Sequence, residues 1–332
     1  MATLHSAYRP PVWLPGGHLQ TLYPALLARR SAVDYRRQRW DTPDGDFIDL
    51  DWTENQNSGL RIEDGAQPLL VLFHGLEGSS RSHYARALMH AAVARGWRGV
   101  VVHFRGCSGE LNRLPRAYHS GDSAEIDWIL RRMQQRQGGA PLYAAGVSLG
   151  GNALLKWLGE QGAAAAAILR SAAAMSAPVD LHAAGTALEQ GFNRIYTKNF
   201  LMTLIKKSLA QLRVHPRLFD GKRVRAARTL REFDNLVTAP LHGFSGVDDY
   251  WTRASSKPYL TQITVPTLML NACNDPFLPA AALPGVHAVS VAVTTAFPEE
   301  GGHAGFMTGT FPGTLAWPAQ AILGFMASAR QQ

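Results

Sequence analysis

The segment 141–152 constrains the fold of this chain more than any other stretch. Its apolar residues 142–145 predict a short buried strand, and a helix is predicted from Asn152 onward. Between them stands a G-x-S-x-G pattern centred on Ser148, which on a strand-to-helix turn is typical of a nucleophile elbow. The flanking glycines remove side chains that would collide with the strained turn. Because the chain contains 31 glycines, an ordinary strand-to-helix turn is the alternative interpretation.

An elbow serine needs partners, because its hydroxyl becomes a good nucleophile only when a base removes the proton. Asp275 follows the apolar run 265–273, which predicts a strand. His303 lies on a glycine-rich loop after a second strand-like run, 286–293. Serine, acid, histidine is the chain order expected of a triad built on such an elbow. We therefore predict that Ser148, Asp275 and His303 are the catalytic residues.

A second glycine-rich loop follows the predicted strand 68–73 and begins at His74 with the sequence H-G-L-E-G. Loops of this type carry backbone N–H groups that face a substrate carbonyl oxygen. We predict that the amides of Leu76 and Leu149 form the oxyanion hole, because such donors point to where negative charge develops. His74 itself is interpreted as an organiser of the loop rather than as a base. The predicted substrate-binding residues are His74, Gly75 and Phe306.

Length and composition limit the class of protein. A chain of 332 residues, 46% of them hydrophobic, suffices for one large α/β domain with an insertion or for two small domains. Two cysteines, Cys107 and Cys273, give no disulfide framework and favour a reducing compartment, so we expect a cytoplasmic protein. Residues 1–31 lack the apolar stretch of a signal peptide, and the alanine-rich run 163–175 is too short for a membrane span.

The remaining segments predict alternating strands and helices around the elbow. Residues 1–30, rich in proline and glycine, are expected to be an ordered loop lying across the body. His18 in this loop either faces the site or is a hydrogen-bonded structural residue. The other predicted elements are a hairpin over 36–52, a helix over 82–95, a strand over 99–104, a helix over 123–135, a strand over 167–171 and a closing helix over 314–330.

The segment 178–260 is too long for a simple connection and has helical stretches, so we interpret it as a cap inserted into the core. The predicted fold is α/β, with a mostly parallel central sheet flanked by helices. The core comprises residues 1–177, including the N-terminal loop and hairpin, and residues 261–332. Within the cap, Asp248 and Asp249 are reserve candidates for the triad acid.

The cap also carries two groups of residues that each permit two interpretations. Its basic side chains either contact an anionic membrane weakly or form a solvated helix face. Its apolar side chains either face the site or serve helix packing. The basic residues are Lys206, Lys207, Arg213, Arg217, Lys222, Arg223, Arg225, Arg228 and Arg231, and the apolar ones are Phe192, Phe200, Leu201, Leu204 and Ile205. The net charge of +8 is not accompanied by a nucleic-acid-binding motif, so we expect no nucleic-acid partner.

Taken together, six motifs resemble the YheT-like branch of the α/β-hydrolases, to which eukaryotic alpha/beta-hydrolase-domain lipases are related. They lie at residues 17–21, 74–80, 104–109, 118–121, 146–152 and 238–244. The resemblance covers nearly the whole chain. It implies an α/β-hydrolase fold and a carboxylic-ester hydrolase (EC 3.1.1.-) whose triad is Ser148, Asp275 and His303.

These motifs predict acyl transfer through Ser148 without a metal or an organic cofactor. The expected substrates are short-to-medium-chain acyl esters or monoacylglycerol-like lipids. An acyltransferase or thioesterase with the same triad is one alternative, and a binding module with a vestigial site is another. A haloalkane dehalogenase is disfavoured, because its elbow needs a carboxylate where this chain has Ser148.

Overall fold

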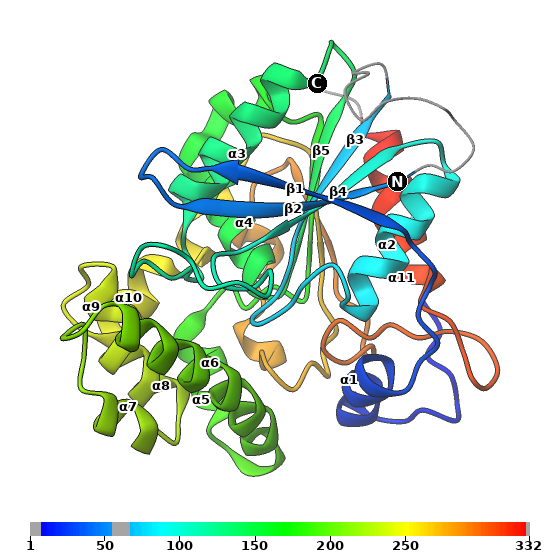
Figure 1. Cartoon of the computed structure of the whole chain (residues 1–332). Coiled ribbons are helices and arrows are strands. Elements are labelled where there is room, and N and C mark those ends of the chain that lie inside the picture. The colour runs from blue at the N-terminus through cyan, green and yellow to red at the C-terminus, as the bar shows by residue number, and fades with distance from the viewer. Residues whose placement is uncertain (1–7, 55–66, 330–332) are drawn as a thin grey trace.

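The computed structural model describes residues 8–54 and 67–329. Over these ranges the chain builds an eight-stranded sheet in the order β1-β2-β4-β3-β5-β6-β7-β8 (Figure 1). The two pairings at one edge, β1 with β2 and β2 with β4, are antiparallel, and all the others are parallel. The strands are β1 (Tyr35–Asp41), β2 (Phe47–Thr53), β3 (Leu69–Phe73), β4 (Arg98–His103), β5 (Leu142–Val147), β6 (Ser171–Met175), β7 (Thr267–Leu270) and β8 (Val293–Ala296).

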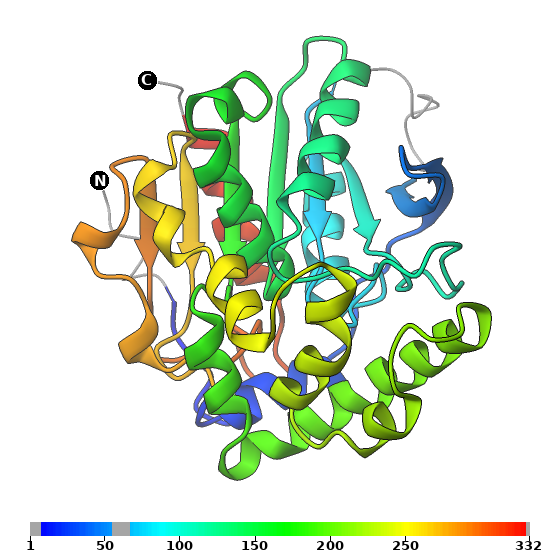
Figure 2. The same ribbon diagram turned by 90° about the vertical axis from the view of Figure 1, so that its left-hand side faces the viewer.

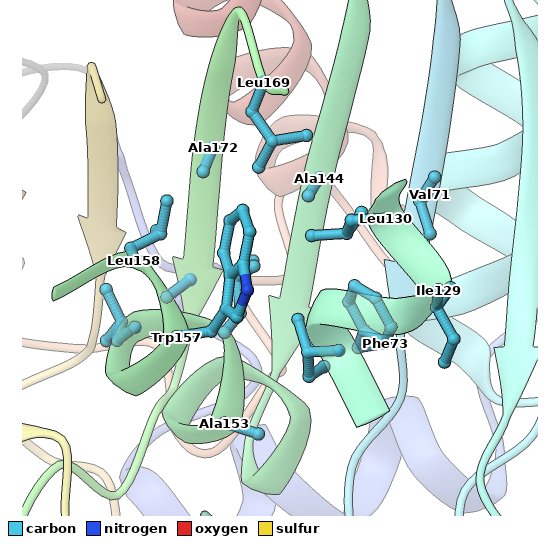
Figure 3. Close-up of a cluster of buried hydrophobic side chains, with 14 of the residues drawn as sticks. Val71, Phe73, Ile129, Leu130, Ala144, Ala153, Trp157, Leu158, Leu169 and Ala172 are labelled. Atoms are coloured by element: carbon cyan, nitrogen blue, oxygen red, sulfur yellow. The ribbon is translucent and has the colours of Figure 1, made fainter. Parts of the chain in front are cut away.

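Helices cover both faces of the sheet, which explains why its central strands are apolar throughout. Successive side chains of a strand point to opposite faces. In β3, Val71 and Phe73 therefore pack with α3 (Ser123–Arg136) and α4 (Leu149–Gln161), around the buried ring of Trp157 (Figure 3). Leu70 and Leu72 pack on the other face, where α2 (His83–Ala94) and α11 (Ala316–Ser328) lie (Figure 1). The fold class predicted from the sequence is confirmed.

The chain between β6 and β7 is helical and lies beyond the C-terminal ends of the parallel strands (Figures 1 and 2). These helices have apolar clusters of their own, one of them around Leu201, Val224 and Phe233. The elements are α5 (Leu181–Leu188), η3 (Gly191–Asn193), α6 (Arg194–Val214), α7 (Gly221–Ala226), α8 (Leu230–Phe233), the π-helical turn η4 (Asp234–Thr238), α9 (Ala239–Leu241), α10 (Val247–Ala254) and η5 (Lys257–Gln262). For brevity we call residues 178–260 the cap.

The prediction of an irregular N-terminal loop is wrong, because α1 (Gly17–Leu26) is a helix. It starts after Gly16, whose φ of 76° only glycine adopts readily. Pro24 lacks an N–H to donate inside the helix, yet the helix persists because the Gln20–Thr21–Pro24 face is buried against the body. Tertiary packing has overridden the local preference of a proline- and glycine-rich sequence.

Two predicted strands are also shifted. The run 167–171 was expected to be a strand, but β6 begins at Ser171, and the alanines before it form the 3₁₀ helix η2 (Gly162–Ala167). The expected strand at 286–293 is likewise wrong: the 3₁₀ helix η7 (Val286–Ala288) occupies its start, and β8 begins only at Val293. Alanine favours helical turns, while the valines at 286 and 291 are exposed and pair with no neighbouring strand.

The other core elements match their predictions to within a few residues. Helix α4 starts at Leu149, directly after the elbow serine, rather than at Asn152. The predicted run 265–273 contains the shorter strand β7, and the closing helix corresponds to α11. A further 3₁₀ turn, η6 (Ala280–Ala282), precedes η7 between β7 and β8. None of the helices in the described ranges has both the length and the apolar character needed to cross a membrane.

One buried carboxyl in the cap is expected to make stability depend on pH. Burial raises the pKa of Asp234 from 3.8 to about 6, although hydrogen bonds from Thr238 and Trp251 act in the opposite direction. The folded protein therefore binds this proton at a higher pH than the unfolded chain does. The carboxylate destabilises the fold above pH about 6, and this penalty disappears as the pH falls toward about 4.

We predict that Asp234→Asn is more stable than the wild type at neutral pH by on the order of 2 kcal/mol, because its Oδ1 can accept from Trp251 Nε1 while its Nδ2 donates to the Thr238 hydroxyl. The advantage should shrink as the pH is lowered from about 7 to about 4. Urea unfolding of both proteins across this range measures the difference, and comparing the two removes the contribution of all other carboxyl groups. A difference that does not change with pH would contradict the raised pKa.

Candidate active site

Ser148 lies between the end of β5 and the first residue of α4, with φ 53° and ψ −123°. This left-handed conformation is strained for a residue with a side chain. It is held by the N–H of Ser148, which donates to the Met175 carbonyl at 2.9 Å, and by close packing of the flanking glycines. A Cβ on Gly150 would lie 2.4 Å from the Phe73 carbonyl oxygen, and one on Gly146 would lie 2.4 Å from the oxygen of Gly150. The elbow pattern is therefore required by this geometry.

The structure brings together the serine, histidine and aspartate that the sequence analysis selected. His303 Nε2 lies 2.9 Å from Ser148 Oγ, and His303 Nδ1 lies 2.9 Å from Asp275 Oδ2. With the ionised carboxylate at Nδ1, that nitrogen carries the proton and Nε2 is left to accept one from the serine. Asp275 is itself oriented by the backbone N–H of Phe277, and the Phe277 ring stacks on the imidazole at 4.0 Å.

The two reserve candidates for the triad acid have partners other than His303. Asp248 is exposed and pairs with Arg231, at 2.6 Å. Asp249 accepts the backbone N–H of Ser245 and pairs with Arg253. Neither is hydrogen-bonded to His303, so the geometry favours Asp275 over both.

Helix α1 holds the backbone of His303 in position, a role that the sequence analysis does not predict. Thr21 Oγ1 accepts the backbone N–H of His303 at 2.8 Å and donates to the Gly17 carbonyl at 2.6 Å. Gln20 Oε1 accepts from the Gly301 N–H and from the side chain of Asn274, so one amide joins the two loops that carry the histidine and the aspartate. The motif 17–21 was recognised as a family feature, but contacts across more than 250 residues leave no local signal of this role.

The two predicted oxyanion amides belong to Leu76, in the loop after β3, and to Leu149, directly after Ser148. Hydrogen bonds fix the loop on both sides of Leu76. The Gly75 N–H donates to the Tyr84 hydroxyl and the Glu77 N–H donates to the Tyr118 hydroxyl, each at 2.9 Å. Between them, the Leu76 N–H has no acceptor among the described residues, and the same holds for the Leu149 N–H at the start of α4. Two backbone donors beside the serine are thus left available for a ligand oxygen.

Glu77 connects this loop to the cap. Its backbone has φ 56°, and its Oε1 accepts from the Tyr118 hydroxyl and from Lys207 Nζ of α6, both at 2.9 Å. The pKa of Lys207 is raised: burial lowers it, but the neighbouring Cys107 and the Glu77 carboxylate outweigh that effect. For the Cys107 thiol, in contrast, burial raises the pKa, to about 11, so this thiol stays protonated at neutral pH.

None of the three predicted substrate contacts lines the cavity beside the triad, although Gly75 lies next to Ser148. His74 is buried, with Nε2 accepting the Phe104 N–H and Nδ1 lying 2.7 Å from the Gly75 carbonyl oxygen. Burial lowers its pKa to about 3, so it is a neutral loop organiser. Phe306 does not line the cavity, which corrects its prediction. A φ of 48° turns it into the core against Tyr8. Gly75 does approach the nucleophile, because a Cβ there would lie 3.0 Å from Ser148 Cβ.

Beside the triad, between core and cap, lies a cavity of ≈ 170 Å³. Ser148, His303, Leu76 and Leu149 line its catalytic end. The cap contributes an apolar wall made by Leu181, Ala184, Leu188, Phe200, Leu204, Phe233, Val237, Leu241, Tyr250 and Trp251, and the core adds polar groups from Arg105, Asn112, Arg116 and His119. The arginines are already paired, Arg105 with Glu125 and Asp46 and Arg116 with Asp122. The cavity can therefore hold an apolar group next to a reactive hydroxyl.

His18 and the cysteines have structural surroundings. His18 Nδ1 lies 3.2 Å from the Tyr196 hydroxyl, and its ring contacts Phe192, so it joins α1 to the cap. Cys107 and Cys273 are free thiols and partly buried. No cluster of three or more His, Cys, Asp or Glu residues suited to a metal ion occurs within the described ranges.

Comparison with known proteins agrees with the fold and with the motifs. A family model described as the alpha/beta hydrolase fold matches residues 68–310, and the chain belongs to this family. Within it, the resemblance to the YheT-like branch is confirmed. The chain is 41% identical to YheT of Escherichia coli (strain K12), a protein whose name gives esterase as a presumed activity, over 90% of this chain and 87% of that one.

More distant relatives extend the comparison. The chain is 33% identical to human phospholipase ABHD3, over 92% of this chain and 75% of the relative. Among solved structures, an esterase of Pyrococcus furiosus superposes with a TM-score of 0.54, covering 90% of this chain and 92% of that one. At 13% identity this likeness supports the fold alone.

We predict that the hydroxyl of Thr21 is needed to hold His303 in position. Thr21→Val keeps the shape of the side chain but leaves the buried His303 N–H without an acceptor, which costs about 1–3 kcal/mol or displaces the loop. We expect kcat for a soluble ester to fall about tenfold with little change in KM. Thr21→Ser keeps the hydroxyl and should retain nearly wild-type kcat. Equal kcat values for the Val and Ser variants would show that this hydrogen bond does not position the histidine.

Proposed function

We propose that the protein is a serine hydrolase that cleaves carboxylic esters through an acyl-enzyme on Ser148. The observation that carries the proposal is the hydrogen-bonded chain from Ser148 through His303 to Asp275, which opens onto an apolar cavity. The membership of the chain in the α/β hydrolase family and the presumed esterase activity of YheT support it. A cytoplasmic location stays a prediction from the sequence.

In the proposed first step, His303 Nε2 removes the proton of the Ser148 hydroxyl as Oγ attacks the ester carbonyl carbon. Asp275 keeps the imidazole in the required tautomer and stabilises its charged form. The negative oxygen of the tetrahedral intermediate accepts hydrogen bonds from the Leu76 and Leu149 amides, each typically contributing about 3 kcal/mol to lowering the barrier. The protonated His303 then donates its proton to the leaving alcohol.

In the second step, a water molecule gives its proton to His303 and attacks the acyl carbonyl. Collapse of the second tetrahedral intermediate releases the carboxylic acid and restores the Ser148 hydroxyl. The proposed mechanism uses the side chains and amides of this chain and requires no metal ion or organic cofactor.

For the substrate we propose short-to-medium-chain acyl esters or monoacylglycerol-like lipids. The apolar wall of the cap supports an acyl chain, because side chains such as Leu188, Leu204 and Phe233 gain contacts with methylene groups. A cavity of ≈ 170 Å³ favours a chain of limited length. In this proposal residues 178–260 act as the cap of the binding site, and the core comprises residues 1–177 and 261–332.

Two other functions use the same geometry. An acyltransferase or thioesterase would form the same acyl-enzyme and differ in the acceptor or in the leaving group. A hydrolase-fold binding module would use the cavity without reaction. Rates with a panel of p-nitrophenyl esters, acyl-CoA thioesters and alcohol acceptors distinguish an acyltransferase or a thioesterase from an ester hydrolase.

Replacing the nucleophile tests the proposal most directly. We predict that Ser148→Ala lowers kcat for p-nitrophenyl butyrate by about 10³-fold or more, because the acyl-enzyme can no longer form. A fluorophosphonate probe should label the wild type and not the variant. Substitution of the exposed Ser245, which lies outside the cavity, by Ala is the matched control. Full esterase activity of Ser148→Ala would remove Ser148 from the mechanism, and a wild type that the probe does not label would favour the binding module.

A second variant tests the acyl site. Leu204 lines the cavity, so Leu204→Trp should fill part of it and reduce kcat/KM for a medium-chain ester about tenfold relative to a short-chain ester. Met202→Trp introduces the same ring on the exposed side of α6 and should leave the ratio unchanged. If the chain-length preference is the same in all three proteins, the acyl chain does not occupy this cavity.

A further inference from the structure

Large apolar side chains are exposed on three elements, α1, η3 and α6, that lie at the same end of the molecule (Figures 1 and 2). On α1 and directly after it these are Leu19, Leu26 and Leu27, from 50% to 73% exposed. On η3 and α6 they are Phe192, Ile195 and Met202, from 46% to 61% exposed. Burying such side chains away from water is favourable, so their concentration indicates an interaction surface.

The two groups form one surface, because α1 touches its neighbours on either side of its exposed leucines. His18 contacts Phe192 of η3, and Leu22 packs against the apolar cluster that contains Tyr196 of α6. On the other side, Tyr23 contacts the exposed ring of Phe311. At 100° per residue, Leu19 and Leu26 fall between these two faces. We call the six exposed residues of α1, η3 and α6, together with Phe311, the docking surface.

The two segments that carry α1, η3 and α6 contain basic but no acidic residues. Residues 8–33 contain three Lys or Arg and residues 190–219 contain six, and neither segment contains an Asp or Glu. Arg194, Lys198 and Lys206 are exposed, and none of them pairs with an acid of the described residues. Lys207, in contrast, points inward to Glu77. An apolar area beside exposed, unpaired basic side chains is complementary to a surface that is apolar inside and anionic outside.

The docking surface also lies close to the cavity. Tyr196 packs between it and Phe277, whose ring stacks on His303 and lines the cavity. The opposite face of α1 holds the His303 N–H through Thr21. We propose that the protein docks onto an anionic lipid surface through this face. The contact centres on α1 and the first half of α6, rather than on the whole basic stretch of the cap considered from the sequence, because Lys207 and Arg231 are engaged in ion pairs within the protein.

Vesicle flotation tests the proposal with the full chain. Wild-type protein should float with vesicles of phosphatidylglycerol and phosphatidylethanolamine and much less with pure phosphatidylcholine vesicles. The double variant Lys198→Glu/Lys206→Glu should lower the bound fraction on anionic vesicles at least about tenfold. Leu26→Asp/Ile195→Asp should weaken binding to a similar extent, since it puts charge where apolar side chains enter the headgroup region.

Matched controls lie at the opposite end of the sheet. Val291 and Arg95 are exposed and precede the first residues of β8 and β4, where the parallel strands begin. Val291→Asp and Arg95→Glu should bind vesicles like the wild type. Hydrolysis of a soluble short-chain ester should be unchanged in all four variants, which shows that they are folded. Ser148→Ala should float like the wild type, so loss of catalysis and loss of docking are separate results.

Three outcomes would overturn the proposal. The wild type does not float with anionic vesicles, or the control variants lose binding as much as the docking-surface variants do. In the third outcome, sedimentation shows a wild-type dimer that Leu26→Asp/Ile195→Asp dissociates, without vesicle binding. The docking surface would then be a contact between two copies of this chain.

Discussion

The close packing of Gly150 against the end of β3 is the constraint on which the site depends. With a side chain at position 150, α4 could not approach the carbonyl oxygens of Phe73 and His74, which lie 2.4 and 2.5 Å from where its Cβ would be. This approach brings the first amide of α4 next to the loop after β3. The nucleophile and both candidate oxyanion donors thus depend on a contact between two neighbouring parallel strands and one helix. A sheet with another strand order would separate them.

The second half of the site depends on α1. Gln20 and Thr21 bond to the loops after β7 and β8, so a helix from the start of the chain fixes the relative position of Asp275 and His303. Gly17 permits this contact, because a Cβ there would lie 2.0 Å from the Asn274 carbonyl oxygen. The same helix exposes Leu19 and Leu26 on its outer face. The sequence of α1 is therefore constrained on one face by its contacts with the loop of His303 and on the other by the binding partner of the docking surface.

The sequence was sufficient to predict the fold class and to select Ser148, Asp275 and His303 as candidates, because each has a local signal. The serine has glycines on both sides, and the aspartate follows an apolar run. Thr21 has no such signal, since its hydrogen bond to His303 joins residues 282 positions apart. Phe306 was misassigned because the positive φ angles of Ala304 and Phe306 reverse the direction that a regular backbone would give the ring. Helix α1 is not predicted, and the strand before His303 is predicted too early in the chain, because packing, not propensity, determines both elements.

The link between Glu77 and Lys207 connects the cap to the candidate oxyanion hole. Glu77 directly follows Leu76, and its carboxylate is bonded to a lysine of α6 and to Tyr118, which also accepts the Glu77 N–H. Displacement of α6 would remove one partner from a carboxylate that is largely buried, at a cost larger than that of a surface ion pair. Through this one carboxylate, the loop that carries the Leu76 amide and helix α6 of the cap are held together.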